Sequence, residues 1–93
     1  MDFEWDENKN RANVQKHHLS FENACRVFAD PLHRSVLQDT LDGEERWETI
    51  GSIGGVLVVV VISTVRYQVG AEIIRIISAR RATKREKRNY EEN

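Results

Sequence analysis

The segment VLVVVVISTVRYQVGAEIIRIIS, residues 56–78, decides the fold. Its first part, VLVVVVIST at 56–64, is the most apolar run of the chain and predicts a buried strand at the centre of a sheet. Its last part, AEIIRIIS at 71–78, predicts a second strong strand. The VRYQVG link at 65–70 is interpreted as a turn and the entry to that strand. This link is too short for a crossover, so the two strands are expected to pair antiparallel.

Three weaker strands are predicted around this pair. HRSVLQDT (33–40) is typical of a strand near a sheet edge, and RWETIGS (46–52) of a strand with mixed faces. The turn signals LDGEE (41–45) and IGG (53–55) separate the strands and predict two hairpins. FEWD (3–6) adds a short strand candidate at the start of the chain, with aromatic residues at alternate positions.

Two helices are predicted in the N-terminal third. Asp6 is a good N-cap for a polar helix over about residues 7–17. Ser20 is the N-cap candidate of a second helix within 18–31, and Pro31 marks its end. The apolar side chains of this second helix recur at helical spacing and form one stripe: Phe21, Ala24, Cys25 and Phe28.

A third helix is predicted at the C-terminus. TKRE (83–86) has the form of a capping box and starts a helix that runs from Lys84 to about Glu91. Arg80 and Arg81 are then expected on the turn between a central strand and this helix. The whole pattern predicts one α+β domain over residues 1–93: a single antiparallel sheet with two N-terminal helices and one C-terminal helix.

Several classes of protein are disfavoured by composition. The single cysteine, Cys25, allows no internal disulfide and is interpreted as a small buried hydrophobe. The longest apolar run, 56–62, is too short for a membrane span, and the acidic start MDFEWDENK is no signal peptide. We therefore expect a cytoplasmic protein that does not bind membranes. CxxC, HExxH, P-loop and GxSxG patterns are missing, so no metal and no cofactor are expected.

Positive charge is concentrated near the C-terminus. The chain has a formal net charge of −1, yet residues 75–90 carry a single acid, Glu86, among seven basic residues: Arg75, Arg80, Arg81, Lys84, Arg85, Lys87 and Arg88. Such a segment is either a solvated helix face or an electrostatic footprint for phosphates. Charge by itself leaves both interpretations open.

Arginine, histidine and tyrosine together suit phosphate chemistry without a metal. Cleavage of RNA by its 2′-hydroxyl needs a base, an acid and cations around phosphorus. Arg80 is either a phosphate ligand or an ion-pair partner of an acid such as Glu45 or Glu48. Arg75, inside an apolar strand, must point to solvent, a carboxylate or a cleft.

The other candidates also have two interpretations. His17 either transfers protons or favours the dipole at its helix C-terminus. Lys84, Arg85 and Arg88 either bind RNA or form a solvated face. Tyr90 either stacks on a base or anchors its helix by packing.

Four segments in the same order resemble the BrnT toxin family of type II toxin–antitoxin systems, and together they cover nearly the whole chain. FEWDENKNRANVQKH resembles the family's opening, with its Phe-Glu-Trp-Asp start, helix lysine, asparagine and Lys-His pair. LSFENACRVFADP is similar to its Ser-Phe-x-x-Ala…Val-Phe-x-Asp-Pro segment. EERWETIG resembles its Glu-Arg-aromatic…Ile-Gly strand, and RIISARRATKREKRNYEE resembles its C-terminal signature.

The resemblance implies a RelE-like fold and a ribonuclease that arrests translation. It also implies neutralisation by a BrnA antitoxin with a ribbon-helix-helix region, through which the complex, expected to be 2:2, binds operator DNA. On this hypothesis Arg80 and Arg81 hold the scissile phosphate and Arg46 reaches the same cleft from a neighbouring strand. Lys9, Lys16 and His17 supply further charge or proton transfer from the first helix. The alternative hypothesis is a binding module without catalysis, for an acidic partner or nucleic acid.

Two positions depart from the family pattern. His18 stands where the family usually has glycine, which adopts the left-handed conformation past a helix at little cost. Either His18 takes on that strain or the helix ends differently. The proline that often follows the first aspartate is replaced by Glu7, which is still compatible with a helix start.

Overall fold

The computed structural model describes residues 1–92 of the chain. The described residues form these elements: β1 (Asp2–Glu4), α1 (Glu7–His17), α2 (Phe21–Ala24), the 3-10 helix η1 (Cys25–Ala29), β2 (Arg34–Leu41), β3 (Glu44–Ile53), β4 (Leu57–Gln68), β5 (Ala71–Arg81) and α3 (Lys84–Glu91). This is an α+β arrangement, as predicted. Within the described part of the chain no helix is long and apolar enough to cross a membrane.

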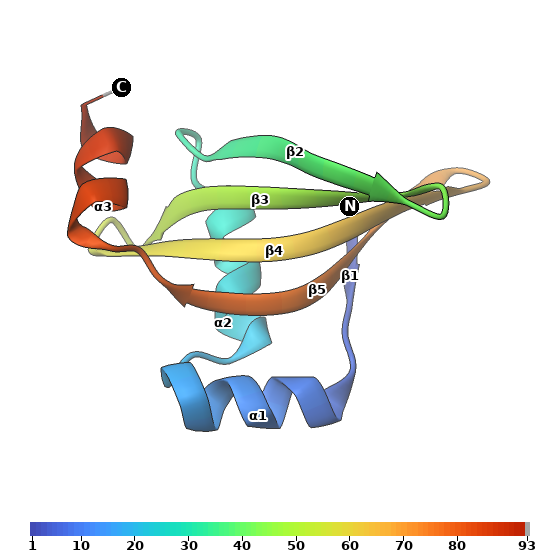
Figure 1. Cartoon of the computed structure of the whole chain (residues 1–93), viewed down its shortest axis with the longest axis horizontal. Coiled ribbons are helices and arrows are strands. Elements are labelled where there is room, and N and C mark those ends of the chain that lie inside the picture. The colour runs from blue at the N-terminus through green and yellow to red at the C-terminus, as the bar shows by residue number, and fades with distance from the viewer. Residues whose placement is uncertain (93) are drawn as a thin grey trace.

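The five strands form one sheet in the order β1-β5-β4-β3-β2 (Figure 1). The prediction that the most apolar strand, β4, is central is confirmed, as are the two hairpins and the edge position of β2. The prediction of a purely antiparallel sheet is wrong, because β1 pairs parallel with β5 and makes the sheet mixed. The direction of this pair depends on two segments about 70 residues apart, so local spacing does not reveal it.

The β4–β5 hairpin is longer than predicted. β4 continues through residues 65–68, which the sequence placed in a turn, and the last pair of the ladder joins Gln68 to Ala71. At the other end, β5 continues to Arg81, which pairs with Val59. Arg80 and Arg81 therefore lie in the strand and not on the predicted turn. The backbone of Ala82 extends the ladder once more by donating to the Val58 carbonyl oxygen.

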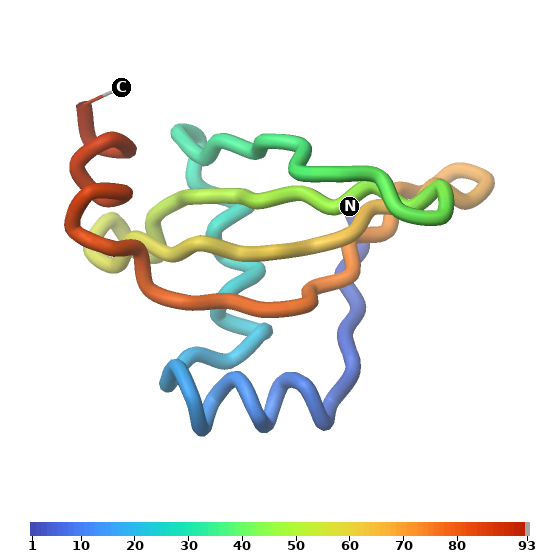
Figure 2. The backbone as a smooth tube through the Cα atoms, viewed as in Figure 1, coloured from blue at the N-terminus to red at the C-terminus, as the bar shows by residue number. Residues whose placement is uncertain are grey.

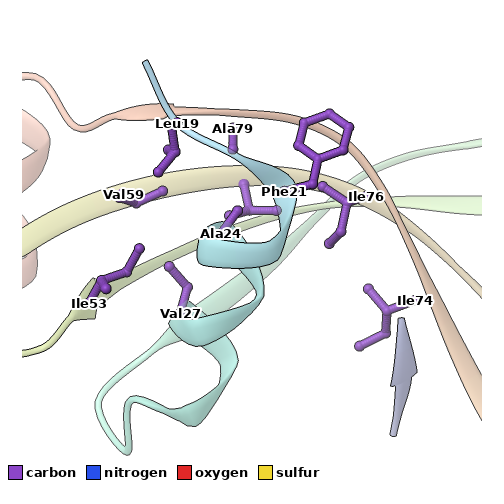
Figure 3. Packing of buried hydrophobic residues seen from close by; sticks show 10 residues of the cluster. Leu19, Phe21, Ala24, Val27, Ile53, Val59, Ile74, Ile76 and Ala79 are labelled. Carbon is purple, nitrogen blue, oxygen red and sulfur yellow. The ribbon is translucent and has the colours of Figure 1, made fainter. Parts of the chain in front are cut away.

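α2 and η1 cover one face of the sheet and build the core there (Figures 1 and 3). The predicted second helix is real only over Phe21–Ala24, and η1 continues it as a tighter 3-10 helix. Because side chains three apart are aligned in a 3-10 helix, Val27 follows Ala24 onto the sheet, and both are fully buried. Of the predicted apolar stripe, Cys25 and Phe28 are only partly buried.

Gly51 on β3 makes this close packing possible. A Cβ atom at this position would lie 2.8 Å from Cγ1 of Val27 and 3.1 Å from its carbonyl oxygen. Any side chain here would push η1 away from the sheet, so Gly51 sets the distance between the two layers.

All three predicted helix starts are confirmed. Asp6 accepts hydrogen bonds from the backbone N–H groups of Asn8 and Lys9, and Ser20 accepts one from Asn23. Thr83 and Glu86 form the predicted capping box. α1 ends with His18 in the left-handed region at φ 56°, so this histidine takes the conformation that glycine adopts more cheaply.

Candidate active site

α1 is attached to the edge of β5 through one buried side chain, Asn13. Its Oδ1 accepts a hydrogen bond from the Ala79 N–H at 3.2 Å, and its Nδ2 donates to the Ala79 carbonyl oxygen at 2.9 Å. Nδ2 also donates to the carbonyl oxygen of Leu19 at 2.8 Å. β1 pairs with β5 only as far as Arg75, so the Asn13 amide takes the place of a neighbouring strand further along.

α1 runs in the same direction as β5 (Figures 1 and 2). At its start, N–H groups of Lys9 and Asn8 lower the pKa of Asp6, and the charges of Lys9 and Arg75 lower it further. Lys9 and Arg75 are therefore close to this N-cap. α1 ends at His17, one turn beyond Asn13, and β5 ends at Arg81, two residues beyond Ala79. The two elements therefore end at about the same distance from the Asn13–Ala79 contact.

His17 and Lys16 occupy this end of α1, and Arg81 is the last residue of β5. Lys16 is exposed and His17 is half-buried. Because both elements run the same way from the Asn13–Ala79 contact, the structure brings these predicted residues to one corner of the domain. The first helix and the last strand are thus joined through Asn13 and Ala79.

Arg80 and Arg81 point to opposite faces, because consecutive side chains alternate along a strand. Arg81 pairs with Val59, which belongs to the core side of the sheet. Arg80 lies on the other side, which we call the open face, in one cross-strand row with Val60, Ile50 and Arg34. A phosphate held by both arginines would therefore have to lie across the edge of β5.

Arg80 forms a two-pronged ion pair with Glu86 of α3. Nη1 lies 2.7 Å from Oε1 and Nη2 lies 3.0 Å from Oε2. The sequence left open an ion pair with Glu45 or Glu48, and the partner is instead the third residue of α3. The bond from Arg80 lowers the pKa of Glu86 to about 2, and the same bond raises the pKa of Arg80.

This ion pair leaves part of the Arg80 guanidinium available. Besides Glu86, only the carbonyl oxygen of Arg81 receives a hydrogen bond from it among the described residues, from Nη1 at 3.3 Å. The Nε–H and one N–H of Nη2 have no partner there. These two donors form the side-on fork that grips two oxygens of a phosphate.

Arg34 and Arg75 also lie on the open face, and the sequence did not identify Arg34 as a candidate. Arg34 donates from Nη2 to the carbonyl oxygen of Asn89 at 3.3 Å, at the far end of α3. Its place in the Arg80 row depends on strand register, which the sequence did not reveal. Arg75 lies 3.7 Å from Glu4, which also pairs with Arg66, so the carboxylate is the partner that its strand position required.

Arg46 is not brought next to Arg80. Its strand β3 is separated from β5 by β4, contrary to the expectation of a neighbouring strand. Arg46 shares a cross-strand row with Thr64 and Arg75, whereas Arg80 shares one with Ile50, four residues away in β3. At about 3.3 Å per residue, these two rows are about 13 Å apart along the sheet.

α3 presents its basic residues to solvent. Lys84, Arg85 and Arg88 are all exposed. Tyr90 is half-buried, and its hydroxyl donates to a carboxylate oxygen of Asp30, which holds the helix against the end of η1. This bond raises the pKa of Tyr90 to about 12. The anchoring role proposed for Tyr90 is thus visible, although through a hydrogen bond and not through packing.

No group of three or more His, Cys, Asp and Glu side chains that could hold a metal ion occurs in residues 1–92. The described corner instead assembles guanidinium, imidazole and ammonium groups around the end of β5. Those groups can bind a phosphodiester, neutralise charge on it and exchange protons with it.

The sequence profile described as "Ribonuclease toxin, BrnT, of type II toxin-antitoxin system" matches residues 5–86. The chain belongs to the BrnT family. The resemblance seen in four sequence segments is therefore confirmed, and it extends to type II toxin–antitoxin systems.

A solved BrnT structure agrees with this assignment. The chain is similar to the ribonuclease toxin BrnT of Brucella abortus, with 27% sequence identity and a TM-score of 0.61. The match covers 90% of this chain and 99% of that one. A comparison with curated proteins found no match. The mixed sheet and its helices are thus the BrnT fold.

Proposed function

We propose that this BrnT-family chain is a metal-independent endoribonuclease that arrests translation. The observation that carries the proposal is Arg80, which Glu86 holds with two N–H groups free at the edge of β5. Arg81 and His17 reach the same corner. An RNA phosphodiester that crosses this edge would meet a guanidinium on each side of the sheet and an imidazole beside it.

The cleavage step requires attack by a 2′-hydroxyl oxygen on the adjacent phosphorus, and the bond from phosphorus to the 5′-oxygen breaks. A base takes the 2′ proton, and an acid protonates the departing 5′-oxygen. In this proposal Arg80 and Arg81 stabilise the extra negative charge that develops on phosphorus. His17 moves protons in this proposal, because histidine is the side chain that most often serves as a general acid or base.

The remaining predicted residues bind the RNA further from the scissile bond. Lys9 and Lys16 extend the positive charge along α1, and Arg75 and Arg46 extend it across the open face. The exposed basic residues of α3 guide the strand electrostatically. Base stacking by Tyr90 stays a prediction. Because the Tyr90 hydroxyl is bonded to Asp30, only the faces of its ring could contact a base.

We further propose that the partner is a BrnA-type antitoxin in a 2:2 complex in the cytoplasm. Its ribbon-helix-helix region would bind operator DNA, so the toxin need not contact DNA itself. An acidic or apolar antitoxin segment over the basic corner would block both charge and activity. The type II family assignment supports the presence of an antitoxin.

The test is cleavage of RNA by the purified protein in the presence of EDTA. Arg80→Ala should lower the cleavage rate about 100-fold or more, since a preorganised donor for transition-state charge is removed. Arg11→Ala, which removes an exposed arginine from α1, is the matched control and should cleave normally. Unchanged cleavage and toxicity in a folded Arg80→Ala protein would exclude this site. RNA binding without degradation would instead identify a binding module.

A further inference from the structure

One groove of the described structure lies behind α3, and Arg80 is not among the residues that line it. It has a volume of about 800 Å³ and is bounded by η1, the loop after it, the β3–β4 turn and α3. Lys87 and Tyr90 line it from α3, whereas Glu86 and Asn89 line a smaller pocket on the open face. The groove is therefore separate from the proposed catalytic corner.

Two large, exposed apolar side chains line this groove. Leu32, on the loop after η1, is 65% exposed, and Val56, on the β3–β4 turn, is 82% exposed. Single exposed apolar residues are common, but apolar side chains gathered around one concavity are typical of a site for a protein partner. The exposed Pro31 lines the same groove.

The same groove has positive charge available. Arg26 and Lys87 form no ion pair within residues 1–92, and the Nη2 of Arg26 reaches to 3.8 Å from the Cβ position of Gly54. Asp30 already accepts hydrogen bonds from Tyr90 and from two backbone N–H groups. Glu91 is the remaining acid and is exposed, without an ion pair to Lys87.

We infer that this groove binds an extended segment of the antitoxin that carries large apolar side chains next to carboxylates. The apolar walls take the former, and Arg26 and Lys87 pair with the latter. RNA is the poorer occupant, because the walls are apolar and the carboxylates of Asp30 and Glu91 offset the two cations. This inference rests on the antitoxin partnership proposed above and not on the ribonuclease chemistry.

The test measures the dissociation constant between variants of this chain and the protein encoded by the neighbouring reading frame. Leu32→Glu and Val56→Glu should each weaken the complex about tenfold or more, because a carboxylate would replace an apolar anchor. Arg26→Glu with Lys87→Glu should weaken it too and reduce its dependence on salt. RNA cleavage in EDTA should be unchanged in Leu32→Glu and Val56→Glu, which alter no basic residue.

Leu41→Glu is the matched control. Leu41 is 69% exposed, similar to Leu32, but lies on the edge strand β2 away from the groove. It should leave the dissociation constant within about twofold of the wild-type value. Equal losses for Leu41→Glu and Leu32→Glu, or no loss for Leu32→Glu, would overturn the inference. Impaired RNA cleavage with unchanged antitoxin binding would assign the groove to RNA. If the wild-type chain did not bind this protein, the proposed partnership itself would fail.

Discussion

The helices α1 and α3 flank the same end of β5 but are attached to it in opposite ways. α1 is held by Asn13, which is 7% exposed and bonds to backbone atoms in the interior. α3 has no buried residue. Its contacts to the sheet side are polar: Arg80 with Glu86, Arg34 with the Asn89 carbonyl oxygen, and Tyr90 with Asp30.

The difference shows which of the two helices is held firmly at the candidate site. Breaking a buried hydrogen bond leaves an unsatisfied group out of reach of water, so α1 is tied to the fold itself. Polar pairs near the surface exchange with water at little cost, and the Arg80 side chain is 42% exposed. We therefore expect α1 to be fixed relative to the sheet and α3 to move more easily. Three variants test this contrast.

The largest expected effect comes from Asn13→Ala. This change leaves the N–H and carbonyl oxygen of Ala79 and the carbonyl oxygen of Leu19 without their partner. We expect a loss of about 2–4 kcal/mol in the free energy of unfolding, measured by urea denaturation. Gln15→Ala, on the exposed side of the same helix, is the control and should cost under about 0.5 kcal/mol. Equal effects of the two changes would contradict the rigid attachment of α1.

Glu86→Gln should have an intermediate effect that separates stability from activity. Glutamine can still accept the Thr83 N–H and preserve the cap, but it loses the charged pair with Arg80. The expected cost is under about 1 kcal/mol of unfolding free energy. RNA cleavage should fall about tenfold, because Arg80 is no longer held in one orientation. Full activity in this variant would show that Arg80 needs no such support.

Acid titration gives the same variant a second readout. The pKa of Glu86 is lowered from its ordinary value of 4.5 to about 2 by Arg80. A lowered carboxyl pKa stabilises the protein above the ordinary value, and this contribution is lost as pH falls through the folded value. The stability difference between wild type and Glu86→Gln should therefore be constant above about pH 5 and shrink between pH 4.5 and 2. A difference that grew on acidification would contradict the ion pair.

Tyr90→Phe should have the smallest effect. It removes the bond to Asp30 but keeps the ring, so we expect about 0.5–1 kcal/mol of lost stability. The pKa of Tyr90 is raised to about 12 by this bond, so its stabilising contribution persists below pH 10 and disappears as pH rises through 12. In an alkaline titration of phenolate absorbance, the variant should lack the step near pH 12. Retention of that step would show that another tyrosine produces it.

Local signals in the sequence predicted the local structure well. Asp6, Ser20 and Thr83 start helices where they were expected, because an N-cap acts on N–H groups two or three residues away. The hairpins followed from short links with turn residues. The parallel β1–β5 pair and the 3-10 form of η1 were missed, since each depends on contacts with a distant part of the chain.

The candidate site was predicted in composition but not in arrangement. His17 ends α1 and Arg81 ends β5, whereas the extension of β5 places Arg80 and Arg81 on opposite faces of the sheet. Glu86 was recognised as a cap, but its second role toward Arg80 requires knowing how α3 turns back on the sheet. No role was predicted for Asn13. Nothing in its spacing showed that its amide would complete a strand edge.

The double role of Glu86 has a consequence for mutational tolerance. The same carboxylate receives the Thr83 N–H, which fixes the first turn of α3, and the Arg80 guanidinium. Glutamine can accept the Thr83 N–H but cannot form the ion pair with Arg80. Aspartate is one methylene too short to make both interactions. A saturation library at codon 86, selected for cells that survive toxin expression, should therefore recover almost every amino acid except glutamate. Separate saturation libraries at codons 85 and 88, whose side chains are exposed, should yield far fewer survivors.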